Sequence, residues 1–211
     1  MLTERDQEIL TLIDRFGVLN SKHIAAAMDM SMHSVYHRVA VMEQRGYLHR
    51  HHTRRGMPDA LTLTAAGAKA AGGTARAKLR LATLAHDWLV ADVLLSYAKS
   101  GCEFRTEREL RAELYDPGRK RREGYVPDGL IKNGNGGWTA LELEISYKTT
   151  ARYEKVVREH LRNPNVTNVT FFCKSRSQAA RLTDIVEAMK LGDFASVKTV
   201  RGVFGDVEAA E

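Results

Sequence analysis

"YVPDGLIKNGNGGWTALELEISYK", residues 125–148, contains two apolar runs separated by a glycine-rich turn, a pattern typical of a β-hairpin. Asp128 lies in the first of these apolar runs. Glu142 and Glu144 alternate with apolar residues in the second. Because side chains alternate along a strand, both glutamates point to one face, where Asp128 of the neighbouring strand can join them. Three carboxylates gathered in this way call for a compensating cation, either a metal ion or basic side chains.

The segments on either side extend this hairpin into a larger domain. Helical periodicity covers residues 84–99, a short strand is expected near 103–105, and Glu107 begins a helix or turn. Two helix–strand pairs follow the hairpin. This order predicts an α/β domain with a mixed sheet over residues 81–203 and a tail at 204–211.

The front of the chain has a different pattern, three short helical segments followed by a basic hairpin. Thr3, Asn20 and Ser31 are suited to cap the three helices with their side-chain oxygens. Three helices and a hairpin predict a winged helix-turn-helix domain at residues 1–66, and the Ala- and Gly-rich stretch 67–80 is expected to be a linker. The expected fold is therefore an α+β winged helix-turn-helix joined to a mixed-sheet α/β domain.

Positive charge is concentrated in this front domain. Residues 1–80 hold 12 Lys and Arg against 7 Asp and Glu, which supplies most of the net charge of +6 and favours a polyanionic partner. In a winged helix the third helix presents polar residues to base edges, and hairpin cations meet phosphates. We expect double-stranded DNA as the partner, bound by a homodimer. The expected DNA contacts are His33, Ser34, Tyr36, His37, Arg38, Arg50, Arg54 and Arg55.

Two other interpretations of this front surface stay open. One is a small helical domain whose polar face is only solvated. The other is a zinc site, since His33 and His37 are four residues apart and three more histidines follow, although no third ligand stands at a defined spacing. DNA-facing side chains account for the histidines with fewer assumptions.

The strand order around Asp128 and the acidic pair resembles the PD-(D/E)xK nuclease fold. The resemblance implies Mg²⁺ or Mn²⁺ as the cofactor of an active site. The implied metal ligands are Asp128, Glu142, Glu144 and Glu107. That family also uses a lysine to orient or activate water, and Glu144 stands at its position. Lys148 or Lys132 would have to reach the site from elsewhere.

Because Glu144 adds negative charge where a phosphate would lie, we expect a nuclease-like domain that does not cut DNA and needs no cofactor. The cations that relieve the carboxylates would then come from the basic loop 119–122 or from the helix with Arg152, Lys155 and Arg158. Three alternatives remain: a metal-dependent endonuclease targeted by the winged helix, a non-catalytic assembly factor of a replication or transfer complex, and a plain solvated strand face.

The chain as a whole is similar to the replication-relaxation family, whose members join a winged helix to a nuclease-like domain. The matching motifs, between about residues 2 and 155, are "LTERDQEIL", "RGYLHR", "LTLTAAG", "LAHDWLVADVLL", "FRTERELR", "VPDG" and "LELEISYKTTARY". The resemblance implies a DNA-binding protein of a mobile element, acting in plasmid or phage replication or in transcription control.

The composition favours a cytoplasmic protein. Cys102 and Cys173 are too few for a disulfide framework, which favours a reducing compartment. The first ten residues carry charges where a signal peptide has its apolar stretch, and no apolar run is long enough for a membrane span.

Overall fold

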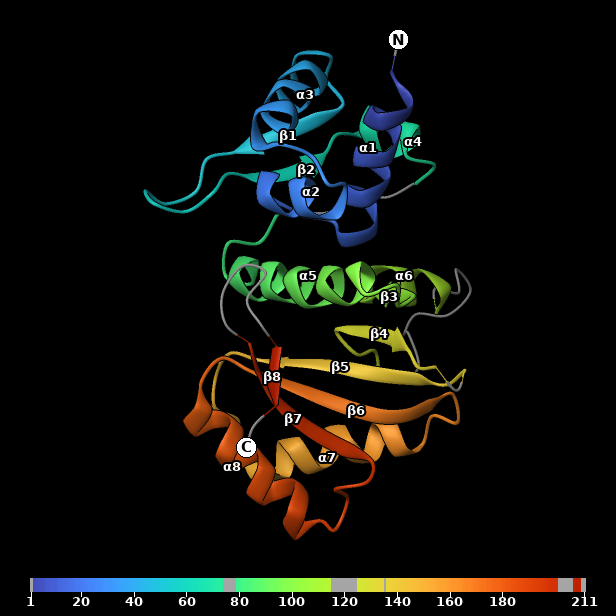
Figure 1. Ribbon diagram of the computed structural model, residues 1–211, viewed down its shortest axis with the longest axis vertical. Helices are drawn as coiled ribbons and strands as arrows, with labels where there is room; N and C mark the ends of the chain where they lie inside the picture. Colours follow the sequence, from blue (N-terminus) through green and yellow to red (C-terminus); the bar gives the residue numbers. More distant parts are fainter. Residues whose placement is uncertain (1, 74–78, 115–124, 135, 201–206, 210–211) are drawn as a thin grey trace. The chain divides into compact units, whose positions relative to one another are not determined.

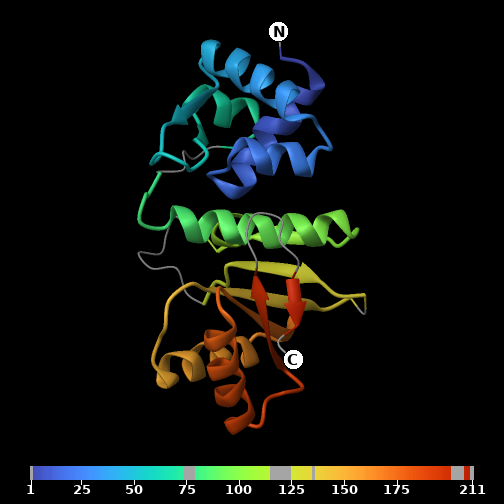
Figure 2. The same cartoon turned by 60° about the vertical axis from the view of Figure 1, so that its left-hand side comes forward.

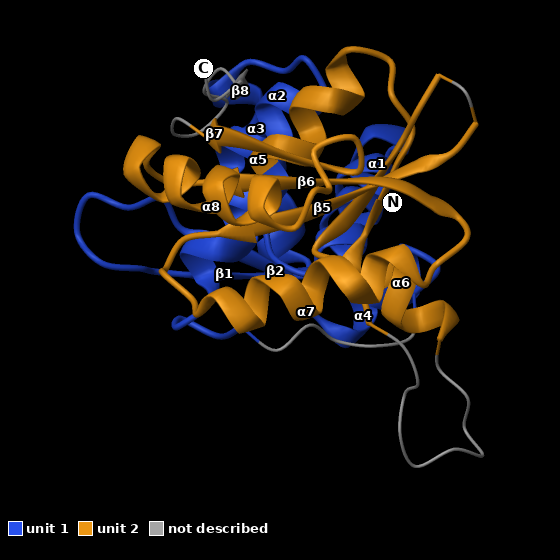
Figure 3. Cartoon of the chain, turned by 90° about the horizontal axis from the view of Figure 1, so that it is seen from below, with its two compact units in different colours: residues 1–91 blue, residues 92–211 orange. Residues whose placement is uncertain are grey.

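The computed structural model describes residues 2–73, 79–114, 125–134, 136–200 and 207–209. The chain divides into two compact units, residues 1–91 and 92–211 (Figure 3). Each unit has its own buried apolar cluster.

The first unit consists of helices around a two-stranded antiparallel hairpin (Figure 1). Its elements are α1 (Glu4–Phe16), α2 (Ser21–Ala27), α3 (Met32–Gln44), β1 (Leu48–His51), β2 (Ala60–Leu63) and α4 (Ala65–Ala70), followed by the first half of α5 (Leu84–Lys99). The three helices and the hairpin lie where the sequence predicts them.

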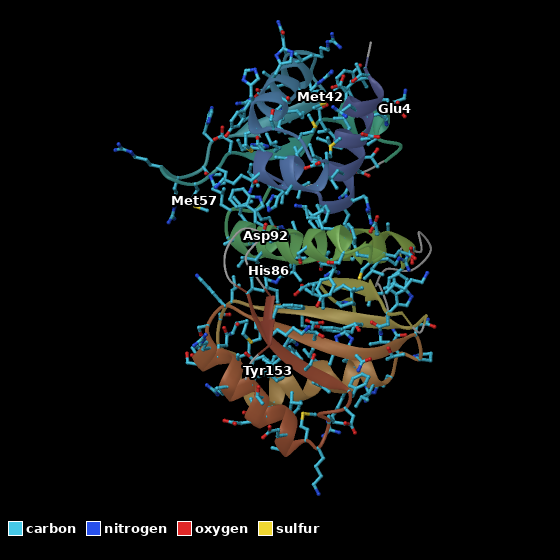
Figure 4. The ribbon with its side chains drawn as sticks, in the orientation of Figure 1. Glu4, Met42, Met57, His86, Asp92 and Tyr153 are labelled. Carbon is cyan, nitrogen blue, oxygen red and sulfur yellow. The ribbon has the colours of Figure 1, made fainter. Side chains whose placement is uncertain are left out.

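The predicted caps explain where the three helices begin. The side chains of Thr3, Asn20 and Ser31 each accept a hydrogen bond from a backbone N–H of the first turn. Thr3 and Asp6 form a reciprocal capping box, and α1 ends at Gly17, whose φ of 81° suits glycine. Met42, labelled in Figure 4, is one of the fully buried side chains that α1, α3 and the hairpin enclose.

The first unit extends beyond the predicted boundary at residue 66. The expected linker, 67–80, contains most of α4, whose Ala68 is buried in the core of this unit. Leu84 and Trp88, from the first half of α5, pack with Val18 and Ala60. Small residues such as alanine and glycine suggest a linker by composition, but Gly67 and Ala68 are buried in the core of the first unit.

The second unit is built on a mixed sheet, as predicted. Its elements after α5 are β3 (Phe104–Thr106), α6 (Glu107–Glu113), β4 (Gly129–Lys132), β5 (Trp138–Glu144), α7 (Thr150–Leu161), β6 (Val166–Cys173), α8 (Arg176–Ala188), β7 (Ala195–Val200) and β8 (Val207–Ala209). The strand order is β3-β4-β5-β6-β7-β8. The pairs β5/β6 and β6/β7 are parallel, and the others are antiparallel. Strand β8 lies in the stretch expected to be a tail.

Helices α7 and α8 cover one face of this sheet (Figures 1 and 2). Their buried side chains, including Tyr153 of α7, pack on Ala140, Phe171 and Cys173 of the central strands. On the opposite face, Tyr97 from the second half of α5 contacts the ring of Phe172 edge-on, with ring centroids 6.4 Å apart. Among the described residues, no helix has the length and apolar character needed to cross a membrane.

Candidate functional site

The outward face of α3 is polar and exposed. Val35 and Val39 are buried on the inner side of the helix, whereas His33, Ser34 and His37 are exposed. Tyr36 is a large aromatic side chain on the same helix and is 53% exposed. Ser31 fixes the start of the helix, and its hydroxyl also bonds that of Ser34 at 2.9 Å. Four of the predicted base-reading side chains therefore lie on one accessible face.

The hairpin between β1 and β2 carries the two predicted phosphate-binding arginines, Arg54 and Arg55, at its turn. Both are exposed, and neither forms an ion pair within the described residues. The Thr53 hydroxyl donates to the backbone carbonyl of Pro58 at 2.9 Å and so ties the two sides of the turn together. Figure 4 labels Met57, which is 43% exposed in the same turn.

A cavity of about 240 Å³ lies between α2, α3 and the hairpin. Its lining includes Lys22 of α2, Tyr36 of α3, Arg50 of β1 and Met57 of the turn. Tyr36 of α3 and Met57 of the hairpin turn thus line one cavity, together with cations and the carboxylate of Asp59.

Two of the predicted DNA contacts are engaged within the protein. Arg38 donates to Asp6 Oδ1 at 3.3 Å and to the hydroxyl of Thr3 at 3.2 Å, so it fastens α3 to the start of α1. The Arg50 side chain donates to Glu43 Oε2 at 3.1 Å and joins β1 to α3. The Arg38 guanidinium helps the Thr3 cap hold the pKa of Asp6 below its usual value, against the opposing effect of burial.

The histidines beside the hairpin have protein partners. A ring nitrogen of His51 lies 2.8 Å from the hydroxyl of Thr62, and one of His52 lies 3.1 Å from Asp59 Oδ1. Burial and the neighbouring His49 lower the pKa of His51. Across the described residues, no three His, Cys, Asp or Glu side chains are placed to hold a metal ion.

In the second unit, Glu142 of β5 points to the face that α7 covers and is only 4% exposed. Its Oε1 lies 2.7 Å from His160 Nε2 of α7, and its Oε2 accepts a hydrogen bond from the Tyr125 hydroxyl at 2.8 Å. The two ring systems that bracket the carboxylate meet edge-on, with centroids 5.1 Å apart. Both oxygens of Glu142 are therefore occupied by side chains of the chain itself.

Glu144 lies two residues further along β5 and is 1% exposed. Its Oε1 forms an ion pair with the Lys148 ammonium, at 2.7 Å. Lys148 therefore folds back to the end of the strand. Lys132, the second lysine expected to be able to reach the site, instead donates a hydrogen bond to Glu103 Oε2 at 2.6 Å. Because both glutamates are buried, the alternative of a solvated strand face is wrong.

The two remaining carboxylates are separately bound. Asp128 Oδ2 accepts a hydrogen bond from the backbone N–H of Leu143 at 2.8 Å, across the β4–β5 pair. Glu107, in the first turn of α6, pairs with Arg111 one turn later. Each carboxylate has its own partner, so the residues present do not fit the shared metal site that the sequence suggested.

Burial dominates the electrostatics of this site. It raises the pKa of Glu142 despite the opposing hydrogen bond from His160, and Asp128 adds to the rise. Burial and the nearby Glu142 also raise the pKa of Tyr125, which keeps its hydroxyl proton available for donation. On the same face, burial and then Glu144 raise the pKa of Cys173 to about 12.

The side chains that contact the two buried glutamates differ from the cations expected. Lys148 and His160 contact the glutamates, while Arg152, Lys155 and Arg158 are exposed on α7. The basic loop 119–122 lies outside the described residues. His160 had a detectable signal, because it continues the buried stripe of α7 formed by Tyr153, Val156 and Val157. Tyr125 carried no such signal.

The chain matches no protein-family model, no curated protein and no solved structure.

Proposed function

We propose that this chain is a sequence-specific DNA-binding protein whose first unit is a winged helix and whose second unit is a nuclease-like module that does not cut DNA. The observation that carries the proposal is that one unit has both an exposed polar face on α3 and two exposed arginines, Arg54 and Arg55, at the turn of its hairpin. Tyr36 of α3 and Met57 of that turn line the same cavity. A major groove admits such a helix, and a hairpin beside it meets the backbone.

The contacts described above divide the predicted DNA-binding residues into two groups. His33, Ser34, Tyr36 and His37 remain available to read base edges, and Arg54 and Arg55 remain available for phosphates. Arg38 and Arg50 act as positioning residues in this proposal, because their guanidinium groups hold α3 to α1 and to β1.

The paired carboxylates of the second unit support the absence of cleavage. A divalent cation at Glu142 would have to displace the Tyr125 hydroxyl or His160, and one at Glu144 would have to displace Lys148. Both replacements break charge-assisted bonds at buried groups, which is costly.

The biological setting rests on the motifs shared with the replication-relaxation family. We include in the proposal a role in plasmid or phage replication or in transcription control. We also include a homodimer, since a helix-turn-helix regulator reads two half-sites of its target.

The binding proposal is tested by the double variant Arg54→Ala, Arg55→Ala. Loss of two phosphate contacts should weaken binding to all duplexes and reduce the slope of log affinity against log salt by about one unit per contact. Fluorescence anisotropy of a labelled duplex at several salt concentrations measures both. The matched control is Arg158→Ala, Arg162→Ala, which removes the same charge from exposed positions on and just after α7. An unchanged slope in the first variant, or an equal drop in the control, contradicts the proposal.

A further inference from the structure

Two segments free of acidic residues leave the sheet at the carboxyl ends of β5 and β6. They are residues 145–152 (ISYKTTAR) and 174–181 (KSRSQAAR). Their cations are Lys148, Arg152, Lys174, Arg176 and Arg181. Because β5 and β6 are parallel, with Glu144 opposite Cys173, both segments start at the same edge of the sheet.

Side-chain contacts join the two segments into one surface. The hydroxyl of Tyr147 lies 3.0 Å from that of Ser177, and the Gln178 side chain donates to the carbonyl of Ser146 at 2.9 Å. The guanidinium of Arg181 lies over the Tyr147 ring, 5.7 Å from its centroid. The orientation of Tyr147 is therefore fixed from the α8 side.

Tyr147 keeps 58% of its surface exposed in this arrangement. An aromatic ring supported by a guanidinium and open to solvent is a platform on which a planar group can stack.

Two of the cations on these segments are accessible. Arg152 and Lys174 are exposed, and neither forms an ion pair within the part of the chain that the structure describes. Lys148, by contrast, is bound to Glu144. Thr149 and Ser175 already cap the two helices that begin here, so side chains and not helix termini supply the attraction.

We propose that this surface, formed by Tyr147, Arg152, Lys174, Arg176 and Arg181, binds single-stranded DNA. The cations contact successive phosphates, and Tyr147 stacks on one unpaired base. This combination of a positive surface with an aromatic ring is the general basis of single-strand binding without sequence choice. A duplex keeps its bases stacked on each other and offers none to the ring. All of these residues lie in the second unit, so the inference goes beyond the winged-helix proposal and does not depend on it.

The test uses the full chain and a fluorescein-labelled oligothymidylate of about 12 nucleotides, within the usual site size. Tyr147→Leu removes the ring and should weaken binding about tenfold, while Tyr147→Phe keeps the ring and should retain most of the affinity. Lys174→Ala, Arg181→Ala should weaken binding and flatten its salt dependence, by about 0.7 per lost phosphate contact. Arg158→Ala, Arg162→Ala is again the charge-matched control, and circular dichroism confirms that each variant is folded.

A competition experiment separates the two DNA sites. Unlabelled oligothymidylate should displace the labelled strand, and an equal concentration of duplex should not. The inference is overturned if Tyr147→Leu binds like the unaltered chain, if the control loses as much affinity as Lys174→Ala, Arg181→Ala, or if duplex competes equally. If Arg54→Ala, Arg55→Ala leaves duplex binding unchanged while Tyr147→Leu weakens single-strand binding, only the winged-helix proposal is contradicted.

Discussion

Glu142 occupies a position where a carboxylate is costly to ionise, inside the second unit and against α7. In place of water, the Tyr125 hydroxyl and His160 Nε2 are the hydrogen-bond partners of the carboxylate. Burial still outweighs them and leaves the pKa of Glu142 raised. We therefore expect Glu142 to make the free energy of unfolding depend on pH.

The first prediction concerns Glu142→Gln and the pH dependence of unfolding. A raised pKa means that the folded state holds a proton which the unfolded state releases, so this group's contribution to stability falls as pH rises above the ordinary value of 4.5. The variant, which cannot titrate there, should be less stable by about 1–2 kcal/mol at the acidic end because one hydrogen bond is poorer. Its deficit should shrink as pH rises.

Urea unfolding at a series of pH values measures this difference. Glu159→Gln, which removes an α7 carboxylate paired with Arg162, is the control and should show no comparable trend. A deficit that grows with pH would mean that pairing with His160, and not burial, governs Glu142.

The second prediction is that only one of the two thiols reacts in the folded protein. Cys173 is fully buried with a pKa of about 12, so its thiolate is scarce at pH 8. Cys102 is partly exposed. A chromogenic disulfide reagent should label one thiol quickly and the second only after denaturant is added. Rapid labelling of both thiols in the native state, or of Cys173→Ala and Cys102→Ala alike, would contradict the described burial.

For the acidic residues of β5, the sequence predicted which side chains share a face better than it predicted their hydrogen-bond and ion-pair partners. Alternation along the strand placed Glu142 and Glu144 on one face, and Lys148 was one of the two lysines expected to be able to reach them. Their partners were not predictable in the same way, because the ion pair of Glu144 depends on how the chain turns back after β5. His160 and Tyr125 come from segments whose docking on the sheet is a tertiary effect.

Among the elements, the helices of the first unit were the most predictable, since each carries local signals. Caps such as Thr3, Asn20 and Ser31 act through bonds within one turn, and buried positions such as Val35 and Val39 recur at helical spacing. The extent of the unit was not predictable from such signals. Residues 84–91 continue a regular helix, and only tertiary packing assigns them to the first unit.

The third prediction assigns sequence choice to α3. Replacing His33 and His37 with alanine should reduce discrimination between the preferred duplex and random duplex, with little change in the salt dependence, because base contacts specify and phosphate contacts set the electrostatic slope. Selection of bound sequences from a random duplex library, before and after the change, measures the preference. If the sequence preference is unchanged while the slope of log affinity against log salt falls, these histidines contact the DNA phosphates and not the bases.

The whole molecule combines a front unit that has exposed cations and an exposed polar face on α3 with a second unit whose buried glutamates are bound by side chains of the same unit. The two features lead to one claim, that the chain binds DNA and does not cut it. A nuclease-like fold of the second unit would not conflict with this claim, since a fold does not determine an activity. The carboxylates and Lys148 then serve the stability of the second unit.

Incubation of supercoiled plasmid with the purified chain, in Mg²⁺, in Mn²⁺ and in chelator, tests that claim most directly. We predict that the plasmid is bound to the same extent in all three conditions and that no nicked or linear form rises above the protein-free background. Metal-dependent nicking that disappears in both Asp128→Ala and Lys148→Ala would contradict the account. It would show that the cluster accepts a cation and that Lys148 leaves Glu144 to take part in cleavage.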